Sequence, residues 1–127
     1  MSAKSRVVLV VEDSDDCAAT LEIALDGHPG FVVRVTATAE DALQVLENQD
    51  IGAVITDLHL PVMDGIEFVS RVRRNARFAY LPLLVISGDA DPDTPRRAHL
   101  AGASAYFAKP YSPGAVRQKL EELIDGR

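Results

Sequence analysis

The apolar residues of this chain are concentrated in five short continuous runs that are rich in β-branched side chains. A continuous apolar run, unlike an alternating one, is typical of a strand that is buried on both faces, as in a parallel sheet. The second run also contains Arg34, which favours a place nearer the edge of the sheet. The runs cover residues 7–11, 31–35, 51–56, 83–87 and 105–108.

Between the runs, apolar residues recur at three- and four-residue spacing, which is typical of amphipathic helices. Such stripes are formed by Cys17, Leu21, Ala24 and Leu25, by Ile66, Val69 and Val72, and by Val116, Leu120, Leu123 and Ile124. Strands and helices therefore alternate five times with short connections. This alternation predicts an α/β fold with a doubly wound parallel sheet.

Residues that commonly begin and end helices flank the helical segments. Thr38 stands three residues before Asp41, like a capping box with aspartate in place of glutamate. Ser112 and Thr94 are each followed by a proline, which predicts a capping hydroxyl at the start of a helix. Three glycines stand where a left-handed residue is expected to end a helix, namely Gly27, Gly102 and Gly126.

Polar residues gather at the carboxyl ends of the predicted strands. In a doubly wound sheet, ligands bind beyond these ends, near the switch in strand order. The residues placed there are Glu12 and Asp13 after the first strand, Asp57 after the third, Ser87 at the end of the fourth and Lys109 after the fifth. Each residue alone is more typical of a cap, a turn or a solvated surface. Their joint placement is what indicates a site.

Three acids at one edge favour a bound cation, because clustered carboxylates raise each other's pKa. Oxygen ligands without cysteine or paired histidines favour Mg²⁺ or Mn²⁺. In such a site one carboxylate can be the nucleophile toward a phosphoryl group, and Asp57 is the best placed. Ser87 could donate to one phosphoryl oxygen, and Lys109 could neutralise another.

Composition limits the remaining classes. The 127 residues predict a single domain, with a core from about residue 6 to residue 124. Thirteen basic against nineteen acidic residues give a net charge of −6, which disfavours direct nucleic-acid binding. The lone Cys17, interpreted as a small buried helix residue, cannot form an intramolecular disulfide, and no apolar run approaches the ~20 residues of a membrane span. We therefore expect a cytoplasmic protein without a membrane partner.

Four segments resemble the receiver domains of response regulators in two-component signalling, including chemotaxis regulators: VLVVEDS, ITDLHLPVMDG, LLVISGD and AGASAYFAKPYS. The resemblance extends from Arg6 to Ile124. It implies a flavodoxin-like sheet of five strands in the order 2-1-3-4-5 with five helices, and a cis peptide bond between Lys109 and Pro110. The family is a phosphoacceptor signalling domain that catalyses only its own phosphorylation and dephosphorylation, and is not otherwise an enzyme.

The resemblance also implies roles for single residues. Asp57 would accept a phosphoryl group from a histidine kinase or a phosphotransfer protein. Asp57 and Asp13 would bind Mg²⁺ directly, Glu12 through water, and His59 through its backbone carbonyl. Glu12 departs from the family, which more often has aspartate there. Its extra methylene could shift the metal by a fraction of an ångström.

The resemblance further implies a switch in which Tyr106 swings inward as Ser87 moves toward the phosphoryl group. The readout surface for a downstream protein would be formed by residues 95–101, 103–107 and 113–124, in a monomer or weak dimer. His59 is unusual two residues after the acceptor. We expect it to pair with Asp89 over the site and to tune the phosphoryl lifetime, unless it is merely an exposed loop histidine. A Zn²⁺ site at His59 is disfavoured because no second ligand stands at suitable spacing.

Two other functions are weighed against this one. An aspartate-nucleophile phosphatase would need a second acid two residues after Asp57, where His59 stands. A degenerate receiver that only binds protein is disfavoured by the complete set of site residues. If the chain is the whole protein, its output must be binding to another protein.

Overall fold

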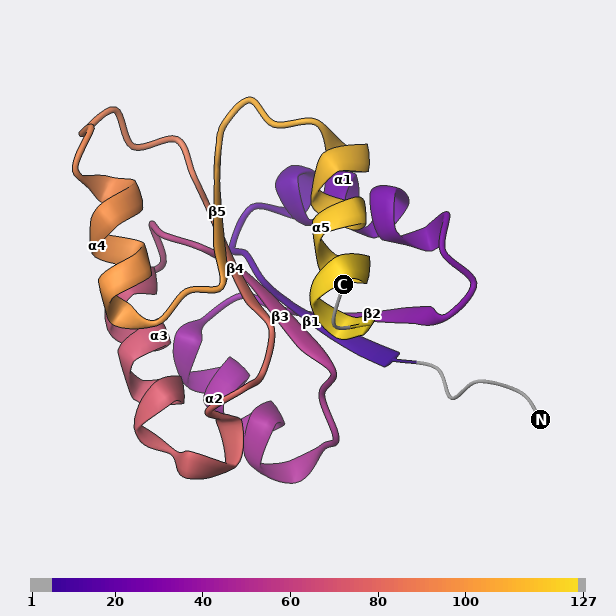
Figure 1. Ribbon diagram of the computed structural model, residues 1–127, viewed down its shortest axis with the longest axis horizontal. Helices are drawn as coiled ribbons and strands as arrows, with labels where there is room; N and C mark the ends of the chain where they lie inside the picture. Colours follow the sequence, from indigo (N-terminus) through magenta and orange to yellow (C-terminus); the bar gives the residue numbers. More distant parts are fainter. Residues whose placement is uncertain (1–5, 126–127) are drawn as a thin grey trace.

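The computed structural model describes residues 6–125 and contains a parallel sheet covered by helices on both faces (Figure 1). The strands are β1 (Arg6–Val11), β2 (Phe31–Thr36), β3 (Ala53–Asp57), β4 (Leu83–Ser87) and β5 (Ala105–Ala108). The helices are α1 (Asp15–Asp26), α2 (Ala39–Asn48), α3 (Gly65–Arg74), α4 (Thr94–Ala101) and α5 (Pro113–Asp125), with a 3-10 turn η1 (Ala76–Phe78). The strand order is β2-β1-β3-β4-β5, so the expected flavodoxin-like topology is confirmed.

The sheet divides the core into two halves. Alternate side chains of β1 show this: Val8 and Val10 pack toward α1 and α5, whereas Leu9 and Val11 pack toward α2, α3 and α4. Both sets are fully buried, which explains why the strand is a continuous apolar run. β2 is an edge strand, and Arg34 is exposed there, as its charge predicts.

Several local predictions are confirmed. Thr38 Oγ1 accepts a hydrogen bond from the Asp41 amide at 3.1 Å, and Ser112 Oγ accepts one from the Ala115 amide at 3.3 Å. Gly102 ends α4 in the left-handed conformation, with a φ of 118°. The peptide bond between Lys109 and its following proline is cis.

Other local predictions are wrong. Thr94 is the first residue of α4 and does not cap it, because its side chain is buried and Oγ1 has no partner within residues 6–125. Gly27 is right-handed, with a φ of −67°. A Cβ there would lie 2.6 Å from Arg117 Nη1, the end of a flexible side chain that could shift to make room. Gly126 lies outside the described residues.

The third strand begins at Ala53 and not at residue 51. The Gly52 amide still donates to the Val7 carbonyl at 2.8 Å, so the chain is already attached to β1 before the strand begins. No helix within residues 6–125 is long and apolar enough to cross a membrane. Because all strands are parallel, their carboxyl ends meet at one edge, with β3 between β1 and β4.

Gly65 holds the segment after β3 against the strand end. Its amide donates to the Leu58 carbonyl at 2.7 Å, and an added Cβ would collide with the Asp57 carbonyl oxygen and lie 2.7 Å from Leu58 Cα. Backbone atoms cannot yield as a flexible side chain can.

We therefore expect Gly65→Ala to lower the free energy of unfolding in urea by on the order of 1–3 kcal/mol. The control is Gly114→Ala, where a Cβ meets only Ser112 Oγ at 3.9 Å and should not destabilise. Equal stability of the two variants would contradict this account.

Candidate functional site

Asp57 is the centre of the site at the carboxyl edge of the sheet. As the last residue of β3 it is 9% exposed, and both of its carboxylate oxygens accept hydrogen bonds. Oδ1 accepts from the His59 backbone amide at 3.1 Å, and Oδ2 accepts from Lys109 Nζ at 3.0 Å. The carboxylate is thereby held between the loop that follows it and the end of β5.

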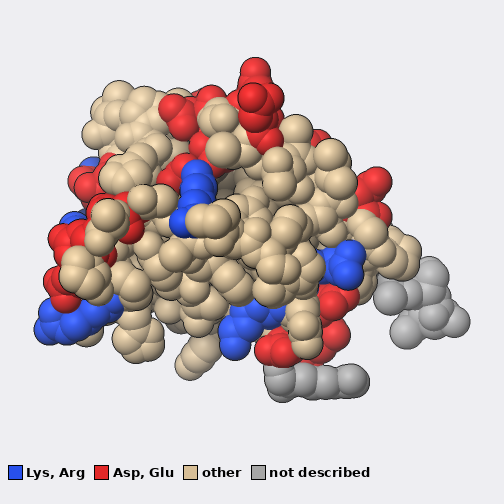
Figure 2. Space-filling view, turned by 90° about the horizontal axis from the view of Figure 1, so that it is seen from above, with Lys and Arg blue, Asp and Glu red and all other residues tan. Residues whose placement is uncertain are grey.

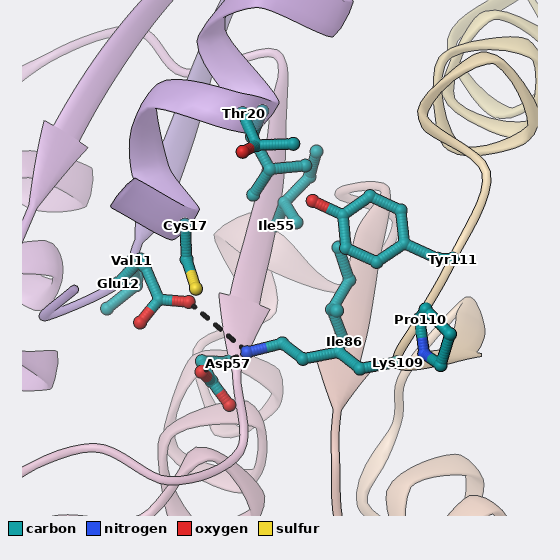
Figure 3. A pocket seen from close by; sticks show the side chains of 11 residues that line it. Val11, Glu12, Cys17, Thr20, Ile55, Asp57, Ile86, Lys109, Pro110 and Tyr111 are labelled. Atoms are coloured by element: carbon teal, nitrogen blue, oxygen red, sulfur yellow. Dashed lines mark hydrogen bonds and ion pairs between the residues drawn. The ribbon is translucent and has the colours of Figure 1, made fainter. Parts of the chain in front are cut away.

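Lys109 connects two acids that come from different strands. Its ammonium lies 3.0 Å from Asp57 Oδ2 and 3.7 Å from Glu12 Oε1 (Figure 3). Glu12, which directly follows β1, is 6% exposed, and its other oxygen accepts the Ser14 amide at 3.2 Å. Because β1 and β3 are neighbours, the two carboxylates lie together, and one cation serves both.

The pKa values of the three groups reflect this crowding. Burial, the hydrogen bond with Asp57 and its negative charge raise the pKa of Glu12 to about 7. Burial also opposes ionisation of Asp57, but the bonds from Lys109, Glu12 and the His59 amide outweigh it and lower its pKa. Burial lowers the pKa of Lys109, and the two acids more than reverse that effect. The pair therefore favours ionised Asp57 beside a Glu12 that holds a proton up to neutral pH.

Ser87 and Asp13 flank this cluster in different ways. Ser87 ends β4 and is fully buried, and its Oγ accepts the Asp89 amide at 2.9 Å. Asp13 is exposed. Within residues 6–125, no three His, Cys, Asp or Glu side chains are gathered so as to hold a metal. The structure thus brings Glu12, Asp57 and Lys109 together and leaves Asp13 outside the contact.

His59 Nε2 and Asp89 Oδ2 lie 3.7 Å apart, so the two side chains that the sequence predicts to pair are in contact. The His59 side chain is 65% exposed, so most of its surface faces solvent. Tyr106 stands apart from these residues. It is half-buried, opposite Val85 on β4, and packs against the core half formed with α2, α3 and α4.

The sequence did not reveal a cavity of about 230 Å³ beside Lys109, between α1 and the segment after β5 (Figure 3). Cys17 lines it and is half-buried, so its interpretation as a buried core residue is wrong. Tyr111 lies opposite, and burial raises the pKa of its phenol. The position of Tyr111, two residues after Lys109, could have indicated one side of this cavity. The other side is formed by α1, which is too distant in the sequence for its position to be predicted.

Figure 2 looks down on the carboxyl edge of the sheet, and acidic side chains lie around much of its rim. This excess of acidic side chains agrees with the net charge of −6. A surface of this sign repels the phosphate backbone of a nucleic acid.

Comparison with known proteins places this arrangement in a family. The family model of the response regulator receiver domain matches residues 8–121. The chain belongs to the response regulator receiver family. It is therefore a receiver domain of two-component signalling, as the sequence motifs predict.

Relatives of this receiver differ in size. It is 32% identical over 122 residues to the sensory/regulatory protein RpfC of Xanthomonas campestris, covering 94% of the receiver but only 17% of RpfC. It is 28% identical to a CheY homolog, a chemotaxis protein of Campylobacter jejuni, covering 92% and 91% of the two chains. A putative response regulator of Chloroflexus aurantiacus has the same fold, with 33% identity, a TM-score of 0.90 and coverage of 96% and 99%. The receiver thus spans a small part of some curated relatives and nearly all of others.

The raised pKa of Glu12 predicts how the stability of the receiver depends on pH. Between the ordinary value of 4.5 and about 7, the folded protein keeps a proton that the unfolded chain releases. Stability from this group is therefore full below pH 4.5 and is lost as pH rises through 7. Glu12→Gln cannot ionise, so in EDTA it should exceed the wild type at pH 8 by on the order of 1–3 kcal/mol, and by much less at pH 5.

Urea unfolding at the two pH values measures this difference. Glu22→Gln is the matched control, because Glu22 is exposed on α1. If the stability of the wild type changes with pH in the same way as that of Glu12→Gln, the pKa of Glu12 is not raised in the folded protein.

Proposed function

We propose that this receiver accepts a phosphoryl group on Asp57 from the phosphohistidine of a histidine kinase or phosphotransfer protein, and thereby changes which protein it binds. The observation that carries the proposal is the 3.0 Å ion pair between Lys109 Nζ and the nearly buried Asp57 carboxylate. It keeps one carboxylate ionised, and hence nucleophilic, beside a second acid that holds a proton.

The transfer is a displacement at phosphorus. A carboxylate oxygen of Asp57 forms the new P–O bond while the P–N bond of phosphohistidine breaks. The electron pair of that bond returns to the imidazole nitrogen, which takes up a proton. Lys109 would then pair with one phosphoryl oxygen, and the Ser87 hydroxyl would donate a hydrogen bond to a second. Both would stabilise the negative charge of the new phosphoryl group.

The donor chemistry of the site fits Mg²⁺, with Mn²⁺ as a substitute. Glu12 and Asp57 provide carboxylate oxygens, the His59 backbone provides a carbonyl, and Asp13 is an exposed carboxylate next in the chain. When both buried acids are ionised, they carry one negative charge more than Lys109 balances, and a divalent ion would offset it. When bound, the ion would neutralise the incoming phosphoryl oxygens.

The readout would be the face formed by α4, β5 and α5. Phosphorylation adds about −1.5 to −2 charges at Asp57, which favours a state in which Ser87 moves toward them. Tyr106, half-buried on β5, would swing inward into the space that Ser87 leaves. The altered face would bind a downstream protein, with the receiver acting as a monomer or weak dimer, and hydrolysis of the aspartyl phosphate by the receiver itself would end the signal.

The two alternatives have less support. A phosphatase would need an acid where His59 stands, and His59 pairs with Asp89 outside the cluster. A purely binding receiver would not need Glu12 and Asp57 buried at a cost around one lysine.

Asp57→Asn should abolish phosphorylation and leave the fold intact, because the amide is nearly isosteric but is not a nucleophile. Mass spectrometry after incubation with acetyl phosphate and Mg²⁺ tests this, since the wild type should gain the mass of one phosphoryl group. Asp64→Asn is the matched control, because Asp64 Oδ1 accepts the Glu67 amide at 2.9 Å as a helix cap and asparagine caps equally well. Labelling of Asp57→Asn to the wild-type extent would exclude Asp57 as the acceptor.

Asp13→Ala should weaken Mg²⁺ binding by about tenfold or more, because loss of a direct ligand should matter at least as much as loss of a ligand's partner. Magnesium titration followed by amide NMR gives the affinity without requiring phosphorylation. Asp15→Ala, at an exposed acid two residues along the chain, should bind as the wild type does. If both variants bind Mg²⁺ equally well, Asp13 is not a ligand.

His59→Ala and Asp89→Ala should each change the rate of autodephosphorylation several-fold, because the two side chains are in contact and, as we propose, would lie over the path of the attacking water. The double variant should be non-additive, as for residues in contact. Decay of phosphorylated protein by mass spectrometry is the measurement, with His99→Ala, an exposed histidine on α4, as control. All variants should still be phosphorylated. Wild-type lifetimes in both single variants would make His59 an ordinary loop residue.

A further inference from the structure

Helix α4 is attached to the domain in different ways at its two ends. The attachment at the C-terminal end depends on Arg73, in the last turn of α3. Its Nε donates to the Gly102 carbonyl at 2.8 Å, its Nη1 to the Phe78 carbonyl at 2.8 Å, and its Nη2 to Ser104 Oγ at 3.2 Å. We call this set of bonds the Arg73 clasp.

The clasp joins three elements to the turn that ends α4. Ser104 Oγ also accepts the Leu83 amide at 3.0 Å, which attaches the turn to the first residue of β4. Gly102 is left-handed, and an added Cβ would lie 2.5 Å from Arg73 Cγ, so the guanidinium stem packs directly on the turn. Within residues 6–125, every acceptor of Arg73 is a neutral oxygen. The clasp is therefore a set of directional bonds and not an ion pair.

At the N-terminal end of α4, no side chain from another helix or strand among residues 6–125 forms a comparable set of hydrogen bonds. Its first turn receives no side-chain cap, and the buried Thr94 hydroxyl has no partner in the described part of the chain. Both features are unfavourable, since a missing cap leaves helix amide groups without partners and a buried hydroxyl without a partner loses its hydrogen bonds to water. This end is the less stable one.

A series of hydrogen bonds leads from Ser87 to this less stable end. Ser87 Oγ accepts the Asp89 amide, Asp89 Oδ1 accepts the Asp91 amide, and Asp91 Oδ1 accepts the Asp93 amide, each at 2.9 Å. Asp93 is the residue that directly precedes α4. A displacement of Ser87 therefore changes the support of each aspartate in turn and arrives at Thr94.

We propose that Arg73 is the pivot of the switch: it fixes the C-terminal turn of α4, so that movement of Ser87 rotates the helix about Gly102. This deepens the proposed function and rests on it, because phosphorylation of Asp57 is what would move Ser87. The N-terminal half of α4 moves, whereas residues 101–104 stay with α3. Arg73 is a positioning residue and does not touch the phosphoryl group.

The test compares amide NMR spectra before and after addition of Mg²⁺ and beryllium fluoride, a mimic of the aspartyl phosphate. In the wild type, shifts at residues 88–95 should be several-fold larger than those at 101–104. Arg73→Met keeps the apolar stem and removes every donor, so the two regions should shift equally. Exchange of the Gly102 and Ser104 amides should also become at least about tenfold faster, since bonds from a charged donor are lost.

Arg71→Met is the matched control, because Arg71 lies on the same helix turn and, among residues 6–125, pairs only with the exposed Glu67 at 2.8 Å. It should keep the wild-type ratio of shifts. If Arg73→Met does not fold, Arg73→Lys replaces it, since lysine keeps the charge but cannot reach all the acceptors, and an intermediate ratio is expected. A wild-type ratio in the Arg73 variant, or equal shifts at both ends in the wild type, overturns the pivot. No shift around Asp57 overturns the proposed function and the pivot with it.

Discussion

The burial of two carboxylates beside one ammonium is the interaction on which the rest of this receiver depends. Glu12 and Asp57 are both almost inaccessible to solvent, and an uncompensated buried charge destabilises a fold by several kcal/mol. The compensation comes from Lys109, which follows the strand farthest along the chain. The strand order places the two acids side by side and requires the long lysine stem to reach across the end of β4.

The sequence predicted β3, β4 and most of β1 well because these strands are buried on both faces and are therefore mostly apolar. The edge strands β2 and β5 are partly exposed, but their short apolar runs still marked them as strands. The sequence also placed Glu12, Asp57 and Lys109 at one edge, where the three side chains are in contact, since parallel strands bring their carboxyl ends together. The strand order itself came from resemblance to a family, because apolar runs do not indicate which strands are neighbours. Arg34 marked β2 as an edge strand only because a charge does not suit a central one.

The failures of sequence reasoning concern contacts between distant segments. Gly27 looked like a left-handed helix terminator, but it is right-handed and lies beside the guanidinium of Arg117 from a distant helix. Thr94 looked like a cap, but the packing of α4 turns its hydroxyl into the interior. Arg73 gave no signal, since an arginine at the end of a helix is ordinary until its acceptors are known. The local sequence pattern predicts where helices and strands lie, whereas the contacts made by residues at their ends depend on the tertiary structure.

The position of Lys109 in the chain has a consequence for the order of folding. The two acids lie at the ends of β1 and β3, which pair directly, whereas their counter-charge arrives only when β5 docks on β4. A nascent chain that has assembled the first three strands therefore has two crowded carboxylates without their cation, and it relieves the repulsion by binding a proton or by keeping that edge open to water. Docking of β5 thus completes the sheet and also brings Lys109 to the two carboxylates at the ends of β1 and β3.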